Sequence, residues 1–318
     1  MGRYHFGIDV GGTKIAYGLY NEQKELVDKH RTSSNKEIGP EEFFDGIDRD
    51  IRMILNRNSL AVSDINGVGI GMPSFILFDE GKILMTTNLT NIKNFAARDY
   101  LSKKLGVRVV IDNDSHTGAI AEHRFGAGRG FRHMIYCPVS TGTSAGLIIN
   151  DHIFRGSYGF SGEAGHMLIT PDEGVLCGCE NKGCFMSHTS GSMIVKHIQK
   201  RIQNGEKTIM TELAGSLENI NAKHIEEAVK MGDDMAKWAL DHMAKYLAVW
   251  IYNMYMLTNI NCFVFGGGLC KFGDMLFGPI RTYFDSYNHN EMPVYFKFAE
   301  LGDDFGIIGA AELLFEEV

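Results

Sequence analysis

Cysteine, basic charge and a secretory leader are all scarce or missing in this 318-residue sequence. Six cysteines are too few for a secreted domain that disulfides hold together. The 31 lysines and arginines are outnumbered by 39 aspartates and glutamates, and the net charge of −8 argues against a nucleic-acid-binding protein. The first residues contain neither a basic n-region nor an apolar h-region, so we expect no signal peptide.

A long uninterrupted apolar run is missing as well. The most apolar stretch, residues 246–265, is broken by Asn253, Asn259 and Asn261, so it predicts a buried helix followed by a strand and no membrane span. A hydrophobic share of 44% and a charged share of 22% are ordinary for a globular protein with a substantial core. We therefore expect one large or two medium domains in a reducing cytoplasm.

Hydrophobic patterning predicts strands and helices that alternate along the chain. The runs 4–9 and 15–20 flank a Gly-Gly turn and predict a β-hairpin. A second strand pair, 134–139 and 146–149, surrounds a turn of Gly, Thr and Ser, so the chain twice shows a strand, a phosphate-loop-like turn and a strand. The other expected strands are 65–70, 107–111 and 262–265, and the expected helices are 41–60, 101–105, 115–125, 192–203, 223–229, 233–257 and 306–315.

The most informative stretch is Cys177-Gly-Cys179-Glu-Asn-Lys-Gly-Cys184, which begins eleven residues after His166. Three thiols and one imidazole suit a closed tetrahedral Zn²⁺ site. The alternative is a disulfide or ordinary buried thiols. Pairing of Cys177 with Cys179 is disfavoured, because side chains at this spacing diverge and the ring would be very small.

Several glycine-rich or polar segments stand at the ends of expected strands. The run Asp9-Val-Gly-Gly-Thr-Lys14 would let backbone N–H groups approach an anion, with the Asp9 carboxylate near a Mg²⁺ ion, although an ordinary hairpin would look similar. It is not a P-loop, because the Gly-x4-Gly-Lys spacing is absent. The triple glycine 266–268 indicates either close approach of a ligand or a tight turn. Asn113-Asp114 suits a helix cap, and a catalytic role can coexist with that.

These motifs, with Gly162-Glu-Ala-Gly-His166 before the cysteines and Ser190-Gly191 after them, resemble the signature of the ROK family (repressors, open reading frames, kinases). The enzymes of that family are ATP-dependent sugar kinases. The resemblance implies an α/β fold of the two-domain actin-like (ribonuclease-H-like) ATPase type, with a cleft between the domains. It implies an N-terminal domain of residues 1–118, completed by the C-terminal helix 306–318, and a larger domain of residues 119–305 with the zinc-binding loop.

The resemblance also places ATP and Mg²⁺ at the glycine-rich turns. The residues it assigns to the nucleotide are Asp9, Gly11, Gly12, Thr13, Lys14, Thr141, Gly142, Gly266, Gly267 and Gly268. The second turn departs from the family pattern at Ser140, Ser144 and Ala145, which adds hydroxyls and keeps the turn.

For the sugar, the resemblance makes Asp114 the general base that accepts the proton of the reacting hydroxyl. The residues it assigns to sugar binding are Ser74, Asn88, Asn113, Asp114, Glu163 and His166. It assigns a structural zinc ion to His166, Cys177, Cys179 and Cys184.

Two departures from the family pattern concern the sugar. The family has Glu where this chain has Met186, and Ser74 replaces the glycine of the usual Pro-Gly turn. A thioether is a poor hydrogen-bond acceptor for a hydroxyl, so the end of the site that faces C1 and C2 is altered. The preferred sugar, whether glucose, an N-acetylhexosamine or a glycoside, stays open.

The expected activity is transfer of the γ-phosphoryl group of ATP to a hexose, at O6. One alternative is a sugar-responsive repressor of the same family, which would carry a helix-turn-helix domain of roughly 80 residues before the first phosphate motif. Here that motif starts at Asp9, so we expect no such domain and no nucleic-acid or membrane partner. A non-catalytic sugar-binding protein is the other alternative, and the intact Asp9 and Asp114 argue against it. A homo-oligomer is expected, with dimer and tetramer both open, as is the phosphoryl donor.

Overall fold

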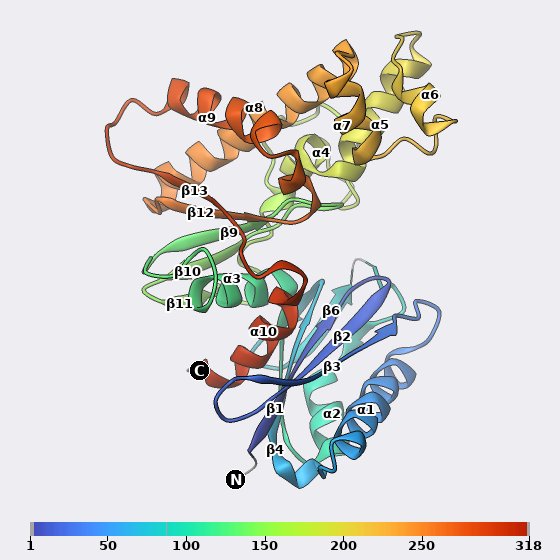
Figure 1. Cartoon of the computed structure of the whole chain (residues 1–318), viewed down its shortest axis with the longest axis vertical. Coiled ribbons are helices and arrows are strands. Elements are labelled where there is room, and N and C mark those ends of the chain that lie inside the picture. The colour runs from blue at the N-terminus through green and yellow to red at the C-terminus, as the bar shows by residue number, and fades with distance from the viewer. Residues whose placement is uncertain (1–2, 87, 317–318) are drawn as a thin grey trace. The chain divides into compact units, whose positions relative to one another are not determined.

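A computed structural model describes residues 3–86 and 88–316 of the chain (Figure 1). These residues form two compact units of mixed α/β structure. The first unit comprises Met1–His133, Gly146–Gly162 and Ala299–Val318, and the second comprises Met134–Ala145 and Glu163–Phe298. Residues 1–2, 87 and 317–318 of the predicted N-terminal domain lie outside the described residues. The domain boundary predicted at residue 118 stays a prediction.

A five-stranded sheet with the order β3-β2-β1-β4-β8 lies at the centre of the first unit. Its strands are Tyr4–Val10 (β1), Lys14–Tyr20 (β2), Leu26–Ser33 (β3), Ile65–Met72 (β4) and Arg108–Asn113 (β8). The strands β1, β2 and β3 are antiparallel to one another, whereas β4 and β8 run parallel to β1. Asp9 is in register with Gly71, and Gly71 with Asp112. The carboxyl ends of three parallel strands therefore share one edge, the edge at which α/β sheets bind ligands.

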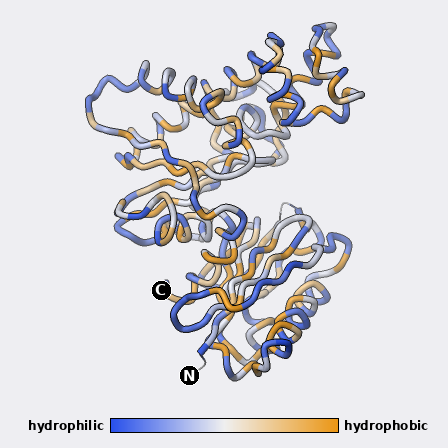
Figure 2. Tube along the Cα trace, in the orientation of Figure 1, coloured by the Kyte–Doolittle hydropathy of each residue, from blue (hydrophilic) through white to orange (hydrophobic). Residues whose placement is uncertain are grey.

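The helices of the first unit cover this sheet. They are Pro40–Arg57 (α1), Ala97–Leu105 (α2), Asp114–Arg124 (α3) and Phe305–Glu312 (α10). The apolar positions of α1 are buried against the core, and Figure 2 shows hydrophobic and hydrophilic residues alternating along this helix. Helix α10 approaches β4 so closely that a Cβ atom at Gly69 would collide with the Ala310 carbonyl oxygen, so this crossing requires glycine.

Smaller elements complete the first unit. Ser74–Leu77 (β5), Lys82–Thr86 (β6) and Lys93–Phe95 (β7) form an antiparallel sheet, and Gly146–Ile149 (β10) pairs with His152–Phe154 (β11). The short 3-10 turns are Val62–Asp64, Gly302–Asp304 and Leu313–Phe315.

Parallel strands and a long helix form the second unit. Met134–Pro138 (β9), Cys262–Gly266 (β12) and Tyr295–Phe298 (β13) pair in that order. The helices are Phe185–Thr189 (α4), Gly191–Gln203 (α5), Met210–Ala214 (α6), Ala222–Lys230 (α7), Asp234–Thr258 (α8) and Asp274–Tyr287 (α9), with 3-10 turns Ala164–His166 and Gly268–Phe272. The core centres on Trp250 of α8, which stacks on Phe185 of α4 at 5.1 Å between ring centroids.

The structure confirms the elements predicted by periodicity, mostly to within a few residues. The predicted helix 101–105 begins earlier, at Ala97, and the helix predicted at 306–315 ends at Glu312 and continues as a 3-10 turn. No helix within residues 3–86 and 88–316 is both long enough and apolar enough to cross a membrane.

Candidate functional site

The turn between β1 and β2 is the segment predicted to bind phosphate. The backbone N–H of Gly11 donates to the Lys14 carbonyl oxygen at 2.8 Å and closes the turn. Neither Gly11 nor Gly12 has a positive φ, so space and not backbone conformation explains the glycines. A Cβ atom on Gly12 would lie 3.0 Å from the Cβ of Asn88. The structure thus brings Asn88, a predicted sugar-binding residue, against the predicted phosphate turn.

Two half-buried carboxylates lie near this turn. Asp9 ends β1, and Asp114 opens α3 directly after β8. Desolvation and, to a smaller extent, the nearby Asp114 carboxylate raise the pKa of Asp9 to about 6, although the Lys14 cation opposes the shift. Burial likewise raises the pKa of Asp114 above its usual range. Carboxylates whose proton affinity is raised by desolvation and by a neighbouring charge are common at functional sites.

Asn113 caps helix α3 and ties it to the neighbouring β5 strand. Its side-chain oxygen accepts from the Ser115 N–H at 2.8 Å, as an N-cap residue does, and its side-chain nitrogen donates to the Ser74 carbonyl oxygen at 3.2 Å. The buried Ser74 hydroxyl donates to the Met72 carbonyl oxygen at 3.2 Å. These bonds fix the backbone on which Asp114 stands, and the roles of Asn113 and Ser74 toward a sugar stay predictions.

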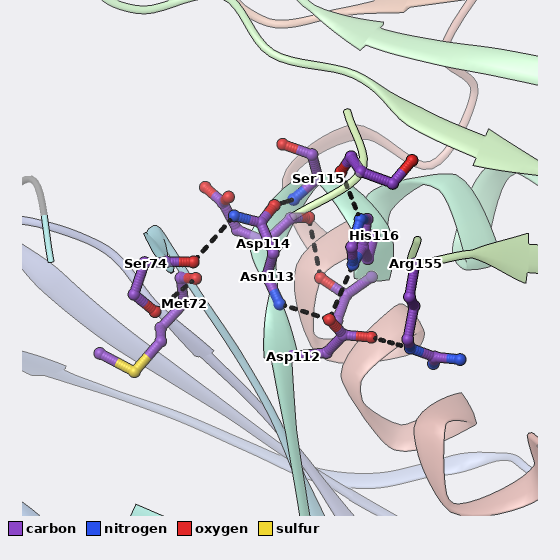
Figure 3. Close-up of polar contacts among 10 residues, drawn as sticks. Met72, Ser74, Asp112, Asn113, Asp114, Ser115, His116 and Arg155 are labelled. Atoms are coloured by element: carbon purple, nitrogen blue, oxygen red, sulfur yellow. Dashed lines mark hydrogen bonds and ion pairs between the residues drawn. The ribbon is translucent and has the colours of Figure 1, made fainter. Parts of the chain in front are cut away.

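Beneath Asp114 lies a buried ionic network that the sequence analysis missed (Figure 3). The Asp112 carboxylate accepts from His116 Nδ1 at 2.7 Å and from Arg155 Nε at 2.8 Å. His116 Nε2 donates to the Ser161 carbonyl oxygen at 2.8 Å, so both ring nitrogens carry a proton. Burial opposes the charge on His116, but the Asp112 carboxylate outweighs it and raises the pKa of His116. Burial also opposes the Asp112 charge, yet the His116 and Arg155 cations hold the pKa of Asp112 below its usual range.

This network links three segments of the first unit. It joins the end of β8 and the start of α3 to residues 155–161, which lead toward Glu163 in the chain. One weak sign of this network is visible in the sequence, a histidine four residues after an aspartate. Nothing in the sequence indicates the part played by Arg155, because it lies 43 residues from Asp112 along the chain. In the structure its guanidinium lies 3.7 Å from the centroid of the Phe78 ring.

In the second unit, the second glycine-rich turn meets the triple glycine. Ser140 N–H donates to the Gly142 carbonyl oxygen at 2.9 Å within the turn. Gly267 has φ +87°, and a Cβ atom there would lie 2.6 Å from the Val139 carbonyl oxygen. These glycines follow the parallel strands β9 and β12, so the two segments assigned to the nucleotide lie side by side. Helix α5 begins beside them, where Gly191 N–H donates to the Ser140 carbonyl oxygen at 2.8 Å. A helix N-terminus favours an anion here.

The Glu163–His166 segment packs against the same turn. A Cβ atom on Gly165 would collide with the Thr143 carbonyl oxygen, so the backbones touch at this point. Met186 of α4 lies beside both segments: a Cβ on Gly165 would be 3.4 Å from the Met186 Cβ, and one on Gly142 would be 3.9 Å from its Cε. Met186 thus lies between the phosphate turn and the segment predicted to hold the sugar.

The four predicted zinc ligands converge. One ligand atom from each of His166, Cys177, Cys179 and Cys184 lies within 4.8 Å of the others. Cys179 Sγ and Cys184 Sγ are 3.5 Å apart, and Cys177 Sγ is 3.6 Å from His166 Nδ1. A disulfide would need about 2.05 Å, whereas the edge of a tetrahedron with Zn–S bonds of about 2.3 Å is about 3.8 Å. All six cysteines are free in the structure, and the spacing of the four side chains suits a metal ion better than a disulfide.

The predicted site residues are therefore divided between the two units. The first unit holds Asp9, the Gly11–Lys14 turn, Ser74, Asn88, Asn113 and Asp114, and the second holds Thr141, Gly142, Glu163, His166, the triple glycine 266–268 and the cysteines.

Comparison with known proteins identifies the family of this chain. The family model described as "ROK family" matches residues 5–317. A glucokinase of Halalkalibacterium halodurans is 31% identical over 98% of this chain and 95% of its own length. An N-acetyl-D-glucosamine kinase of Photobacterium profundum is 30% identical over 97% of this chain and 98% of its own length.

The same relationship holds among solved structures. The ROK family glucokinase of Streptomyces griseus, in complex with glucose and AMPPNP, superposes with a TM-score of 0.79 at 29% identity and covers 98% of each chain. The fold is thus the two-domain actin-like ATPase fold of the ROK sugar kinases, as the sequence predicted. Because the match extends over nearly the whole chain, this chain belongs to the ROK family.

Proposed function

We propose that this protein is an ATP-dependent hexose kinase that transfers the γ-phosphoryl group to a hexose hydroxyl, at O6. The observation that carries the proposal is the pair of half-buried carboxylates with raised pKa values, Asp9 and Asp114, beside a glycine turn at the carboxyl edge of the parallel strands. Relatives named as kinases of glucose and of N-acetyl-D-glucosamine, matched over nearly their full length, support it.

Asp114 is the general base in this proposal. Its burial raises its proton affinity, so the carboxylate accepts a proton more readily than a solvated one as the hydroxyl attacks. Its place in the first turn of α3, capped by Asn113 and supported by the Asp112 network, holds the carboxylate in one position. Exact placement of this group matters, because phosphoryl transfer depends mainly on positioning and electrostatics.

The nucleotide is assigned to the glycine turns of both units. The Gly11–Lys14 turn offers backbone N–H groups and a lysine cation, and the Ser140–Gly142 turn lies at the N-terminus of α5. Asp9 is a hard oxygen ligand of the kind that Mg²⁺ prefers, and a divalent cation would relieve the repulsion between Asp9 and Asp114. When bound, Mg²⁺ supplies positive charge to the transferring phosphoryl group.

A structural zinc ion is assigned to His166, Cys177, Cys179 and Cys184. The donor set and spacing fit a closed tetrahedral site with no open position for a substrate. Its coordination through His166 would hold the Glu163–His166 segment against the second phosphate turn, where Glu163 and His166 can bind sugar hydroxyls.

The expected homo-oligomer is retained as part of the proposal. Large apolar side chains are exposed at the end of α8 and before β13, where Leu257 is 79% and Met292 68% exposed. Such side chains commonly mark an interface between proteins. Light scattering of the purified chain decides between monomer, dimer and tetramer.

We also retain the cytoplasm as the proposed location, because free thiols persist under reducing conditions.

A coupled assay of ADP release over a panel of hexoses, N-acetylhexosamines and disaccharides tests the function. We expect release that depends on one class of sugar. Sequence-specific binding of operator DNA by the purified chain, without sugar-dependent ADP release, would favour the repressor alternative.

A further inference from the structure

Three histidines on three helices of the second unit lie together outside the site described above. They are His188 of α4, His197 of α5 and His242 of α8, and one ring nitrogen of each lies within 4.8 Å of the others. His188 is buried, and the other two are partly exposed. An ion could therefore reach the cluster from solvent.

Hydrogen bonds to surrounding groups leave nitrogen lone pairs for the interior of this cluster. His197 Nε2 lies 3.0 Å from the Ser187 carbonyl oxygen, which can only accept, so Nε2 carries the proton and Nδ1 keeps its lone pair. His188 Nε2 is 2.7 Å from the Thr170 hydroxyl, while His188 Nδ1 faces His242 Nε2 at 3.0 Å. Anchoring one ring nitrogen by an outer hydrogen bond is how proteins orient metal-binding histidines.

Burial also favours the neutral form of all three rings. Burial lowers the pKa of His188 to about 4, and burial together with the neighbouring imidazoles lowers that of His242 to about 3. Nearby cations lower these pKa values further: Lys200 acts on His197, and Arg201 and Lys245 act on His242. Neutral imidazoles are the form that binds metal.

We propose that His188, His197 and His242 form a second metal site, which takes a divalent transition ion of the zinc, nickel and copper class. Imidazole nitrogens suit these ions, whereas Mg²⁺ and Ca²⁺ need oxygen ligands. Three protein ligands leave a position for water, so the site differs in kind from the closed cysteine site. A bound ion would join α4, α5 and α8 to the segment that contains Thr170, which precedes the cysteines.

Cobalt(II) titration of the metal-free full chain separates the two sites, because only the cysteine site gives a thiolate-to-cobalt charge-transfer band. Equilibrium dialysis run in parallel counts the ions. For the wild type we expect two cobalt ions per chain, with the charge-transfer band complete after one of them.

Two variants and a control make the assignment specific. His197→Gln keeps an amide donor for the Ser187 carbonyl and loses the Nδ1 ligand, and His242→Gln removes the third ring. Both should bind one ion per chain with the thiolate band retained, while His289→Gln, at an exposed histidine of the same unit, should still bind two. A single ion per wild-type chain, or two ions per folded chain of either variant, would overturn the proposal.

Discussion

At the scale of single residues, Asp114 differs from an ordinary aspartate in the first turn of a helix in that it is half-buried near another carboxylate and has a raised pKa. Replacement by Asn keeps the size and the start of the helix but removes the proton acceptor. We expect Asp114→Asn to lower kcat by about 10²–10⁴-fold. Sugar affinity, measured by calorimetry, should change little. Asp303→Asn, at an exposed position, is the matched control and should leave kcat unchanged. Near-full turnover by Asp114→Asn would remove the residue from the mechanism.

Met186 bears on which sugar the enzyme prefers. Its side chain lies between the Gly142 turn and Gly165, in place of a glutamate that would accept hydroxyl hydrogen bonds. Losing such an acceptor should cost unmodified glucose on the order of 1–3 kcal/mol of binding. Met186→Glu should therefore raise kcat/KM for glucose relative to a sugar substituted at C1 or C2, measured as a ratio in one competition assay. If the wild type already prefers glucose and the ratio does not move, Met186 serves only in packing.

At the scale of elements, the loop that contains the cysteines has little hydrophobic core of its own, because Leu168 and Leu176 are both about half exposed. Metal binding would therefore supply folding energy to this loop. Cys179→Ser should lose zinc, falling from about one ion per chain by elemental analysis, and should melt at a lower temperature. Cys270→Ser, outside the cluster, is the control that should keep its zinc. Metal-free wild-type protein with unchanged melting would contradict the assignment.

The Asp112–His116 pair stabilises the start of α3, the helix that carries the proposed general base. Both side chains are buried, so removal of Asp112 leaves the His116 cation without its carboxylate, and removal of His116 leaves Asp112 with Arg155 as its one charged partner in the network. We expect Asp112→Asn and His116→Gln to be coupled by about 1–3 kcal/mol in a double-mutant cycle of urea unfolding. The exposed Glu226–Lys230 pair of α7 should give a coupling near zero.

The same cycle has a predicted pH dependence. The raised pKa of His116 means that its contribution is present below its unfolded value of 6.5 and is lost as pH rises through the folded pKa. The lowered pKa of Asp112 means that its contribution is present above 3.8 and is lost as pH falls through the folded pKa. The coupling should therefore be largest between these two values and decline at alkaline pH. A coupling that does not change with pH would show that the pair is not ionic.

Sequence patterning predicted most elements with a regular apolar face, and the elements it missed include an exposed edge strand and a helix that contains proline. Helix α1 was predictable because Phe43, Phe44 and Ile47 fall on one buried side. The strand β3 is an edge strand without a buried residue, so it carries no alternating apolar signal. Helix α9 contains Pro279, a residue that normally ends a helix, and was missed for that reason.

At the scale of the whole molecule, membership of the ROK family and the kinase reading followed from short motifs at strand ends. Those motifs have fixed spacing because a turn and its ligand impose it, so they can be recognised in the sequence. The side chains that hold the motif residues in place cannot be recognised in this way. Arg155 and His197 act through partners on other elements, and only the folded chain brings these pairs together.

The most direct test of the account is to measure the products formed from ATP and sugar. The purified chain is incubated with ATP, Mg²⁺ and each sugar of the panel, and ADP and sugar phosphate are quantified in the same sample by mass spectrometry. The account predicts one sugar monophosphate per ADP for at least one hexose or hexose derivative, with the phosphoryl group on O6. ADP release that does not depend on sugar, or no sugar phosphate from any member of the panel, would contradict it.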